Sequence, residues 1–434
     1  MLKQKTYYFC LIASIFAVVT FSGCKSQKGT SQQAEKVPAN GPQWVKNSLT
    51  NVGVFNVPEV IFTEKFDEHK QHENIKGLFF NGLNFHGKQT NVFCWYGVPE
   101  TLKDGDKAPA VVLVHGGGGT VFPQWVKKWT DQGYIAISVA LEGQVPGPKT
   151  EKSPLEAGHP NHKLSGPFRK GFFLDLMEEK LEDQWFYHAV ADIIMANSLL
   201  RSFPEVDTTK IGITGISWGG ILTNVVTGID NRFAFAIPVY GCGFLHEAPT
   251  YIGQLEAHTP ESKQFYLENW EPSLYAPLQN HPTLFVNGTN DGHFSMNSFT
   301  KTYKASGAYK YLHVEHEMQH GHGAGWNPEE IYRFADYVVG RGKEQVKFKF
   351  NTEKNTVNFD GELREAFAYY TNDTADWSAK SYKWLKADVL LSNSTNTIKV
   401  ELPESAVYYF VNGIDTEGLM HSSPMVKIEC NEPK

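Results

Sequence analysis

The chain has 434 residues, which is more than one ordinary domain needs and predicts two or three domains. Hydrophobic residues make up 41% and charged residues 20% of the sequence, a composition that excludes an intrinsically disordered chain. The formal net charge is −7 and the basic residues form no block, so we expect no nucleic-acid partner.

The N-terminus has the pattern of a secretory leader. Two lysines precede an apolar run at 11–21, which is too short to span a bilayer but suits the core of a signal peptide. A Ser-Gly pair then comes directly before Cys24, a placement that resembles the bacterial lipoprotein signal. We therefore expect residues 1–23 to be removed and Cys24 to carry lipid. An ordinary secretory peptide followed by a chance cysteine is the alternative.

Residues 24–41 are polar and are expected to form a flexible tether. The protein would then be a lipid-anchored lipoprotein of a bacterial cell envelope, periplasmic or at the cell surface, with the anchor as its only contact with a membrane. Beyond the tether the cysteines are Cys94, Cys242 and Cys430, too few for a disulfide framework. No Cys/His cluster has zinc spacing, so we expect no metal.

The middle of the chain, residues 42–343, predicts an α/β domain. An alternating apolar pattern around 75–98 favours antiparallel strands at its start. Short continuous apolar runs, typical of strands buried on both faces, follow at 110–114, 135–140, 210–214, 233–239, 283–286 and 311–315. Helix-like segments, such as 124–131, 181–202 and 329–339, lie between several of these runs. This alternation predicts a doubly wound, mostly parallel sheet.

Residues 344–434 have a different pattern. Short alternating strands are separated by turn residues, and we find no helical periodicity. We expect a small β-sandwich of about immunoglobulin size, with an immunoglobulin-like arrangement.

The strongest motif is GISWGG at 215–220, which follows an apolar strand and precedes a helix-like stretch. In that context Gly-x-Ser-x-Gly forms the nucleophile elbow, which places Ser217 on a strained turn with its hydroxyl above the sheet. The flanking glycines let neighbouring backbones approach. A plain turn is the alternative.

A second motif, HGGGG at 115–119, directly follows a predicted strand. A glycine run exposes backbone N–H groups that can bind a developing oxyanion. We expect the N–H groups of Trp218 and Gly117 to do so, with Gly116 as the alternative to Gly117. A flexible turn and a phosphate loop are other interpretations, but no Gly-Lys-Ser/Thr follows.

The acid and the histidine should follow the serine in that order. Asp291 lies in a glycine-rich loop just past a predicted strand, although a turn aspartate is also common. The candidate bases are His293, His313, His316, His320 and His322. Loop position favours His320, with His322 as the alternative, and either could instead be a polar pocket residue. His320 would deprotonate Ser217 and Asp291 would fix the imidazole, without a metal or organic cofactor.

These motifs resemble the α/β-hydrolase superfamily, in the order strand–HGGGG, strand–GISWGG–helix, strand–GTND and strand–HGH–helix. Within it the chain resembles the acetylxylan esterase and dienelactone-hydrolase-like branch, which includes bacterial lipoproteins with a C-terminal β-domain. The supporting segments are AVVLVHGGGGT, ENWEPSLYAP and HGHGAGWNPEEIYRFADYV. The resemblance covers 75–343 well and the β-domain less well. The spacing of the histidine after its strand in these relatives favours His320, and the serine at position 217 argues against dienelactone hydrolase activity itself, which uses cysteine.

The resemblance implies a serine-dependent hydrolase of carboxylic esters, most simply a carbohydrate esterase of the acetylxylan type acting on an acylated carbohydrate or another ester. A small serine peptidase of the prolyl-oligopeptidase type and a non-catalytic glycan-binding surface lipoprotein are the alternatives. Segment 142–180 is expected to be an insertion over the active site. Aromatic residues flank the motif loops and suit sugar rings, but they are equally ordinary core residues: Trp125, Trp218, Tyr240, Trp270 and Trp326.

Overall fold

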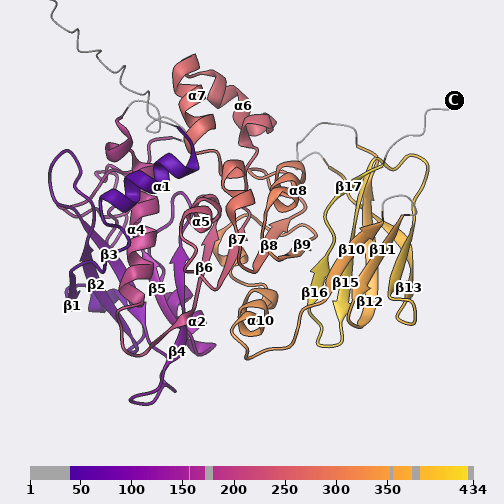
Figure 1. Ribbon diagram of the computed structural model, residues 1–434, viewed down its shortest axis with the longest axis horizontal. Helices are drawn as coiled ribbons and strands as arrows, with labels where there is room; N and C mark the ends of the chain where they lie inside the picture. Colours follow the sequence, from indigo (N-terminus) through magenta and orange to yellow (C-terminus); the bar gives the residue numbers. More distant parts are fainter. Residues whose placement is uncertain (1–39, 156, 172–178, 352–354, 374–381, 429–434) are drawn as a thin grey trace, which may run out of the picture. The chain divides into compact units, whose positions relative to one another are not determined.

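The computed structural model describes residues 40–155, 157–171, 179–351, 355–373 and 382–428, which form a large α/β domain and a C-terminal β-domain (Figure 1). The predicted leader, Cys24, most of the tether and Cys430 lie outside these residues.

The α/β domain contains a nine-stranded sheet in the order β1-β2-β3-β5-β4-β6-β7-β8-β9. Strands β1 to β3 are antiparallel, β3 pairs antiparallel with β5, and the six strands from β5 to β9 are parallel. This confirms the doubly wound, mostly parallel sheet. The strands are β1 (Val60–Thr63), β2 (Ile75–Asn81), β3 (Asn91–Gly97), β4 (Ala108–Val114), β5 (Ile135–Val139), β6 (Val206–Ile216), β7 (Phe235–Val239), β8 (Thr283–Gly288) and β9 (Lys310–Glu315).

Helices connect and cover these strands. They are α1 (Pro42–Asn51), α2 (Pro123–Asp131), α4 (Trp185–Leu200), α5 (Trp218–Ile229), α6 (Pro249–Glu256), α7 (Pro260–Asn269), α8 (Met296–Ala305), α9 (His322–Gly325) and α10 (Glu329–Val338). The helix expected from residue 181 begins at Trp185, because Gln184 is extended and a separate 3-10 turn precedes it.

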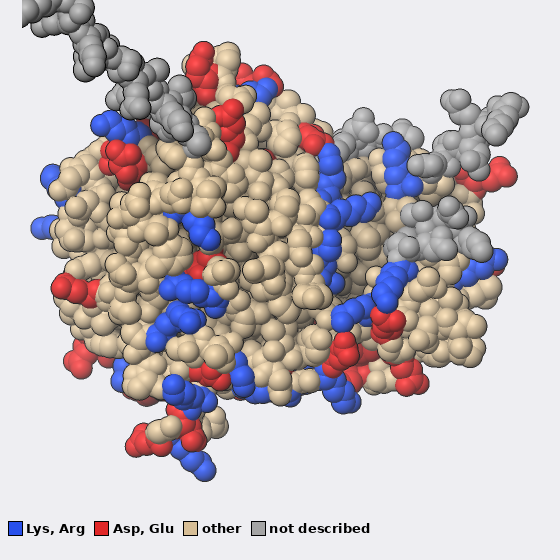
Figure 2. All heavy atoms as spheres, viewed as in Figure 1, with Lys and Arg blue, Asp and Glu red and all other residues tan. Residues whose placement is uncertain are grey.

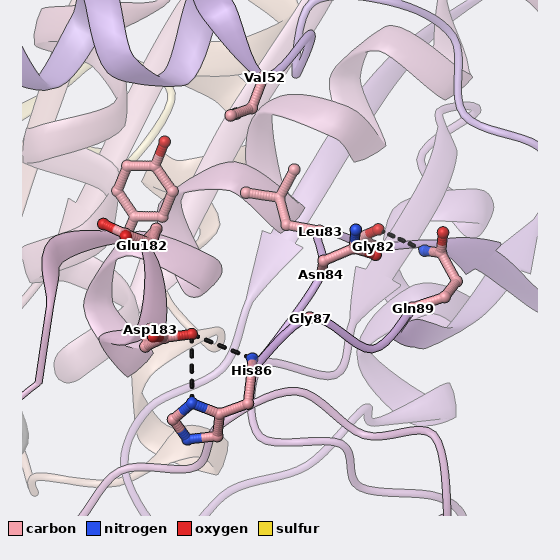
Figure 3. Close-up of a pocket in the computed structure, with 10 residues that line it drawn as sticks. Val52, Gly82, Leu83, Asn84, His86, Gly87, Gln89, Glu182 and Asp183 are labelled. Carbon is pink, nitrogen blue, oxygen red and sulfur yellow. Dashed lines mark hydrogen bonds and ion pairs between the residues drawn. The ribbon is translucent and has the colours of Figure 1, made fainter.

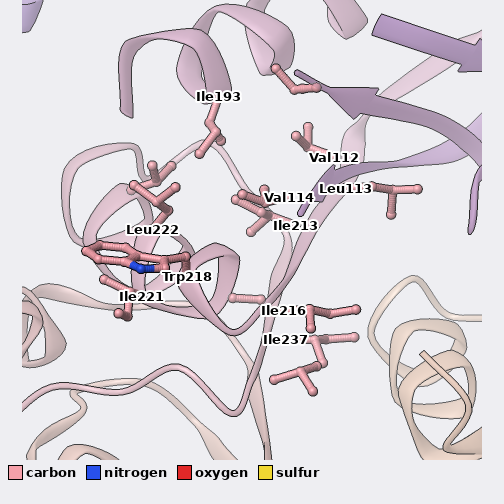
Figure 4. Packing of buried hydrophobic residues seen from close by; sticks show 14 of the residues in the cluster. Val112, Leu113, Val114, Ile193, Ile213, Ile216, Trp218, Ile221, Leu222 and Ile237 are labelled. Carbon is pink, nitrogen blue, oxygen red and sulfur yellow. The ribbon is translucent and has the colours of Figure 1, made fainter. Parts of the chain in front are cut away.

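The centre of the sheet is a packed hydrophobic core. Every residue of β4 is buried, as expected for a strand covered on both faces. In Figure 4 Val112 and Val114 point toward Ile193 of α4 and Leu222 of α5, whereas Leu113 points away from them. The glycine loop at 115–119 and the turn at Ser217 therefore follow strands that are firmly packed in the core.

The C-terminal β-domain is antiparallel throughout, in the order β10-β11-β14-β13-β12-β15-β16, with β17 paired to β15. Strand β13 pairs with β12 through its first three residues and with β14 through its last five, so it joins the two halves of the domain. The small C-terminal β-domain is thus confirmed, and its immunoglobulin-like character stays a prediction. Its strands are β10 (Lys347–Asn351), β11 (Thr356–Asp360), β12 (Leu363–Thr371), β13 (Leu385–Ser392), β14 (Thr397–Glu401), β15 (Tyr408–Asp415), β16 (Met420–Ser422) and β17 (Val426–Lys427).

The β-domain covers the outer edge of β9, the last strand of the large sheet. The backbone N–H of Val314 donates to Ser422 Oγ at 2.8 Å, and Asn412 Nδ2 donates to the carbonyl of Val314 at 3.0 Å. Both polar groups of this strand residue thereby find partners that a free sheet edge lacks.

The surface carries both signs of charge. Figure 2 shows basic and acidic side chains interspersed with neutral ones over the face in view. Among the described residues, no helix has the length and apolar character needed to cross a bilayer.

Candidate active site

Ser217 occupies the sharp turn between β6 and α5. Its φ of 59° and ψ of −115° lie in a region that non-glycine residues rarely adopt, so the turn is strained. A Cβ on Gly215 would lie 2.0 Å from the carbonyl oxygen of Gly219, and a Cβ on Gly219 would lie 2.0 Å from that of Val114. Only glycine fits at these two motif positions. The serine itself is half-buried, so part of the residue reaches the surface.

Ser217, His320 and Asp291 form one hydrogen-bonded chain. His320 Nε2 lies 3.1 Å from Ser217 Oγ, and His320 Nδ1 lies 2.6 Å from Asp291 Oδ2. Because a carboxylate can only accept, Nδ1 carries the proton and Nε2 is left to accept the serine proton. The structure therefore brings together the three residues that the sequence proposed as nucleophile, base and acid.

Two backbone donors orient the acid. Asp291 is 1% exposed, and its Oδ1 accepts the N–H groups of His293 at 2.8 Å and Phe294 at 2.9 Å. His293 therefore contributes its backbone to the acid loop. Of the other candidate bases, His313 is buried in β9 and His316 stacks on Tyr369 of the β-domain, with ring centroids 4.5 Å apart.

Tyr240 packs against His320 and bonds to the residue before it. Its ring centroid lies 4.6 Å from that of His320, and its hydroxyl donates to the carbonyl of Gln319 at 2.8 Å. Burial raises the pKa of Tyr240, which keeps the phenol neutral. The sequence offered this residue only as one of several aromatics, because its contact with the base depends on β7 lying beside β8.

The loop after β4 supplies the second part of the site. A Cβ on Gly116 would lie 2.9 Å from Ser217 Cβ, so the glycine loop passes directly over the nucleophile. The N–H of Gly116 donates to His322 Nε2 at 2.9 Å. Gly116 is thus already engaged, and His322 is bonded to this loop rather than to the serine.

Gly117 is another donor of this loop. Its N–H has no acceptor among the residues that the structure describes, and a Cβ there would lie 3.0 Å from Trp218 Cδ1. Trp218 is the first residue of α5, where backbone N–H groups point out of the helix. Gly117 and Trp218, the residues of the two donors expected from the sequence, are therefore neighbours in space.

A buried ion pair borders this loop, which the sequence did not reveal. Arg169 Nη2 would lie 3.2 Å from a Cβ on Gly117, and the guanidinium carbon lies 5.9 Å from the centroid of the Trp218 ring. Arg169 Nε is 4.0 Å from Glu142 Oε1, and each side chain is 9% exposed. Both residues belong to the insertion expected over the active site, which therefore places a positive charge beside the glycine loop.

Several of the aromatic residues that were possible sugar platforms are core residues. Trp125 is 1% exposed, and Trp270 and Tyr240 are fully buried, so none of the three offers a free face to a sugar. Trp218 is 5% exposed, and Trp326 is half-buried against Trp125 and Phe122.

A small cavity adjoins the end of the glycine loop. It has a volume of about 310 Å³, and its lining includes Thr120, Phe122 and His159. His159 Nε2 lies 3.3 Å from the carbonyl of Gly118, which ties the cavity to the glycine loop. The lining of the cavity includes none of Ser217, Asp291 and His320.

A larger cavity of about 610 Å³ lies elsewhere, between the turn after β2 and the start of α4 (Figure 3). Asp183 Oδ1 accepts the backbone N–H of His86 at 3.0 Å and lies 3.5 Å from its Nδ1. Glu179 stands close enough for the three side chains to surround an ion. Because the Asp183 carboxylate already has His86 as its partner, we assign no metal, and its absence stays a prediction.

Comparisons with known proteins identify the family to which the chain is similar. The family model of acetyl xylan esterase (AXE1) matches residues 29–256, more than half of the chain, and that of the prolyl oligopeptidase family matches residues 177–339. A curated protein named probable dipeptidyl-peptidase 5, from Aspergillus clavatus, is 25% identical over 166 residues, which cover 36% of this chain and 19% of that relative. The chain thus spans about a fifth of the length of that relative.

Two solved structures share the fold. An acetyl xylan esterase from Paenibacillus sp. R4 is 18% identical, with 68% of this chain and 94% of that chain covered and a TM-score of 0.53. Acetyl xylan esterase 1 from Thermoanaerobacterium sp. JW/SL YS485 is 16% identical, with 68% and 93% covered and the same TM-score of 0.53. With an α/β-hydrolase sheet, a serine on its elbow and a family match over most of that domain, the chain belongs to the acetyl xylan esterase family.

Proposed function

We propose that this protein is a serine esterase that removes acetyl groups from a carbohydrate of the acetylated-xylan type. The observation that carries the proposal is the hydrogen-bonded chain Ser217–His320–Asp291, in a member of the acetyl xylan esterase family. An accessible serine whose proton can pass to a neutral imidazole is what acyl transfer requires.

The reaction follows from the positions of these groups. Ser217 Oγ attacks the acetyl carbonyl carbon while His320 Nε2 takes the hydroxyl proton, and the carbonyl oxygen becomes an oxyanion facing the N–H groups of Gly117 and Trp218. When the intermediate collapses, the sugar oxygen takes the proton from His320 and leaves as an alcohol. Water, deprotonated by the same imidazole, then attacks the acetyl-serine and releases acetate. Asp291 stays ionised and balances the imidazolium charge.

A peptidase is the second candidate, because the prolyl oligopeptidase family model matches residues 177–339, which contain all three triad residues. The same triad can cleave an amide if the leaving amine is protonated. The two candidates differ in substrate, so a substrate panel separates them.

The test uses the purified protein on acetylated xylan, p-nitrophenyl acetate, a uronic-acid methyl ester and peptide p-nitroanilides. We expect acetate from the first two, with turnover lost in Ser217→Ala. Cleavage of the anilides without release of acetate would reverse the choice in favour of the peptidase, and methanol release alone would move the substrate to methyl esters. No turnover of any member of the panel would reject the hydrolase.

We also propose that Cys24 carries a lipid that anchors the protein in a bacterial cell envelope. The support is the sequence pattern alone, an apolar run followed by Ser-Gly-Cys. In cells fed radioactive palmitate, Cys24→Ser should abolish labelling, and Cys10→Ser, within the leader that is removed, should keep it. Label retained in Cys24→Ser would contradict the anchor.

A further inference from the structure

His322 stands two residues after the proposed base but contacts a different part of the site. Its Nε2 accepts the N–H of Gly116 at 2.9 Å. An imidazole nitrogen can accept only when it is unprotonated, so this bond requires a neutral ring whose proton is on Nδ1. His322 therefore contributes a fixed acceptor to the glycine loop.

A second imidazole holds the same glycine from its other side. His115 Nε2 accepts the N–H of Leu141 at 3.2 Å, which leaves Nδ1 as the protonated nitrogen, and this Nδ1 donates to the carbonyl of Gly116 at 2.8 Å. The same carbonyl also accepts the N–H of Gly119 at 3.0 Å. Both polar backbone groups of Gly116 are therefore tied to histidines that come from different ends of the domain sequence.

Planarity connects these bonds with the oxyanion donor. The carbonyl of Gly116 and the N–H of Gly117 belong to one peptide unit, and in a trans peptide they point in opposite directions. Fixing the carbonyl with His115 therefore sets the direction of the Gly117 N–H. The bond from His322 fixes the preceding peptide unit, so the two rings together remove the rotational freedom that glycine otherwise has.

Tight packing holds the ring of His322 in place. A Cβ on Gly119 would lie 2.6 Å from His322 Nε2, and the Phe122 ring lies 4.8 Å from the imidazole, centroid to centroid. Trp326 adds a second aromatic neighbour at 6.5 Å. The ring can hardly shift without moving the loop.

Burial, with smaller contributions from neighbouring charges, favours neutral rings at both positions. Burial, with smaller contributions from His320 and His159, lowers the pKa of His322 to about 4. Burial lowers the pKa of His115 to about 3, against its hydrogen bond to Gly116 and with help from His322, His159 and Arg169. Both imidazoles can thus keep these bonds at neutral pH.

We infer that His322 is a positioning residue of the proposed esterase: with His115 it locks Gly116 and so aims the N–H of Gly117 at the oxyanion. The inference rests on the proposed function, because an oxyanion forms only if acyl transfer takes place. It also assigns the second histidine of the HGH motif a role distinct from that of the first, which acts on the serine proton.

The test compares three variants. His322→Leu removes the acceptor at similar size, His322→Gln keeps an acceptor oxygen, and Gly323→Ala changes the next residue, whose added Cβ would contact nothing within 4 Å. For His322→Leu we expect kcat on p-nitrophenyl acetate to fall by about 10- to 100-fold with KM changed less than about threefold, because the N–H contributes mainly in the transition state. His322→Gln should recover most of the loss, and Gly323→Ala should match wild type.

A second readout does not need turnover. Phenylboronic acid forms a tetrahedral adduct on the serine, and its affinity should fall in His322→Leu by about the same factor as kcat. If wild type hydrolyses no ester but this affinity still falls in His322→Leu, the esterase assignment fails and the role of His322 stands.

Two results would overturn the inference in a folded His322→Leu protein. One is kcat and boronate affinity within about twofold of wild type, and the other is a rise in KM with kcat unchanged, which would make His322 a substrate contact. If His322→Leu does not fold, the comparison of His322→Gln with His322→Asn tests the inference instead. The Asn side chain is shorter, so its oxygen no longer reaches the N–H of Gly116, and kcat should be lower than in His322→Gln. Equal kcat for these two would contradict the inference.

Discussion

Asp291 uses its two carboxylate oxygens for different tasks. Oδ1 accepts two backbone N–H groups of its own loop, and Oδ2 accepts the proton-bearing nitrogen of His320. The first set of bonds fixes the carboxylate and the second fixes the imidazole. A substitution that keeps the shape of the side chain but turns Oδ2 into a donor therefore tests whether this bond sets the tautomer of His320.

Asp291→Asn is the substitution that does this. An amide at Oδ2 can donate to His320 Nδ1, which would put the imidazole proton on Nε2 and leave nothing to accept from Ser217. We expect kcat to fall by about 10⁴-fold with little change in KM, as the wrong tautomer causes in serine hydrolases. Steady-state kinetics on p-nitrophenyl acetate measure it, and a loss below tenfold would argue that another group orients the base.

At this scale, what the sequence could predict depended on local spacing. The sequence singled out Ser217 because its turn demands glycines at fixed offsets, and His320 because it follows β9 by a short loop. The bond between Gly116 and His322 joins residues 206 positions apart, and nothing local signals it. Arg169 was missed for the same reason, since its place beside Gly117 depends on how a long insertion folds back.

The turn between β6 and α5 is the part of the fold in which close packing most restricts the choice of residue. Carbonyl oxygens of the neighbouring backbone occupy the space where side chains at Gly215 and Gly219 would lie. Backbone cannot move aside as the far end of a side chain can, so the whole strand–turn–helix unit would have to deform. The strained φ of Ser217 persists only because this unit is packed from both sides.

Gly219→Ala should therefore destabilise the protein and abolish activity together. We expect the free energy of unfolding to fall by more than about 2 kcal/mol, as for other overpacked sites. The matched control is Gly253→Ala in α6, where an added Cβ has no neighbour within 4 Å and alanine favours the helix. Urea unfolding of both variants measures the difference, and similar stability of the two would contradict the steric argument.

Element prediction succeeded where the hydrophobic pattern was simple. The buried parallel strands appear as continuous apolar runs because helices cover both faces of the sheet. Helices α6, α7 and α8 were not among the expected segments; in α7 only Tyr266 and Asn269 are buried, too few to create a clear period. The change of partner along β13 could not be anticipated either, because it depends on tertiary pairing.

At the scale of the whole molecule, the β-domain supports the loop that carries the acid. Trp384 Nε1 donates to the carbonyl of Thr289 at 3.4 Å, two residues before Asp291. Tyr382 donates its hydroxyl to Asn297 Oδ1 at 3.0 Å, just beyond the same loop. The C-terminal domain thus contacts the α/β domain on both sides of Asp291.

Trp384→Ala should loosen this support. Because a buried indole and its hydrogen bond are lost, we expect a loss of stability of about 3 kcal/mol or more, together with a lower kcat. Leu390→Ala, at a β13 position that is 59% exposed, is the control and should leave both unchanged. Calorimetry measures the stability of the two variants and steady-state kinetics measure their kcat. A stable, fully active Trp384→Ala would show that the loop carrying Asp291 does not need the β-domain.

Buried neutral histidines should make the fold sensitive to acid. Burial lowers the pKa of His188 to about 4 and that of His115 to about 3, so between those values and about 6.5 the unfolded chain binds protons that the folded chain does not. Stability should therefore decrease as pH falls from about 6.5 to 4, by at most about 1.4 kcal/mol per pH unit for each histidine.

His188 suits the test because it lies outside the active site. Its Nε2 contacts the carbonyl of Glu182 at 3.0 Å. His188→Gln keeps a donor for that carbonyl but cannot titrate. Urea unfolding at pH 7 and pH 4.5 should show a smaller difference for this variant than for wild type. An equal difference would assign the acid sensitivity to other groups.

The contact between β9 and the β-domain has a consequence for biosynthesis. A ribosome delivers Val314 well before it delivers Asn412 and Ser422, the residues that satisfy its backbone. During that interval the nascent hydrolase domain has an open strand, to which extended segments of other chains can add. A chain truncated before Asn412 would thus keep Ser217, Asp291 and His320 but expose the unpaired edge of β9. We expect aggregation, rather than a missing catalytic group, to be the main defect of such a chain.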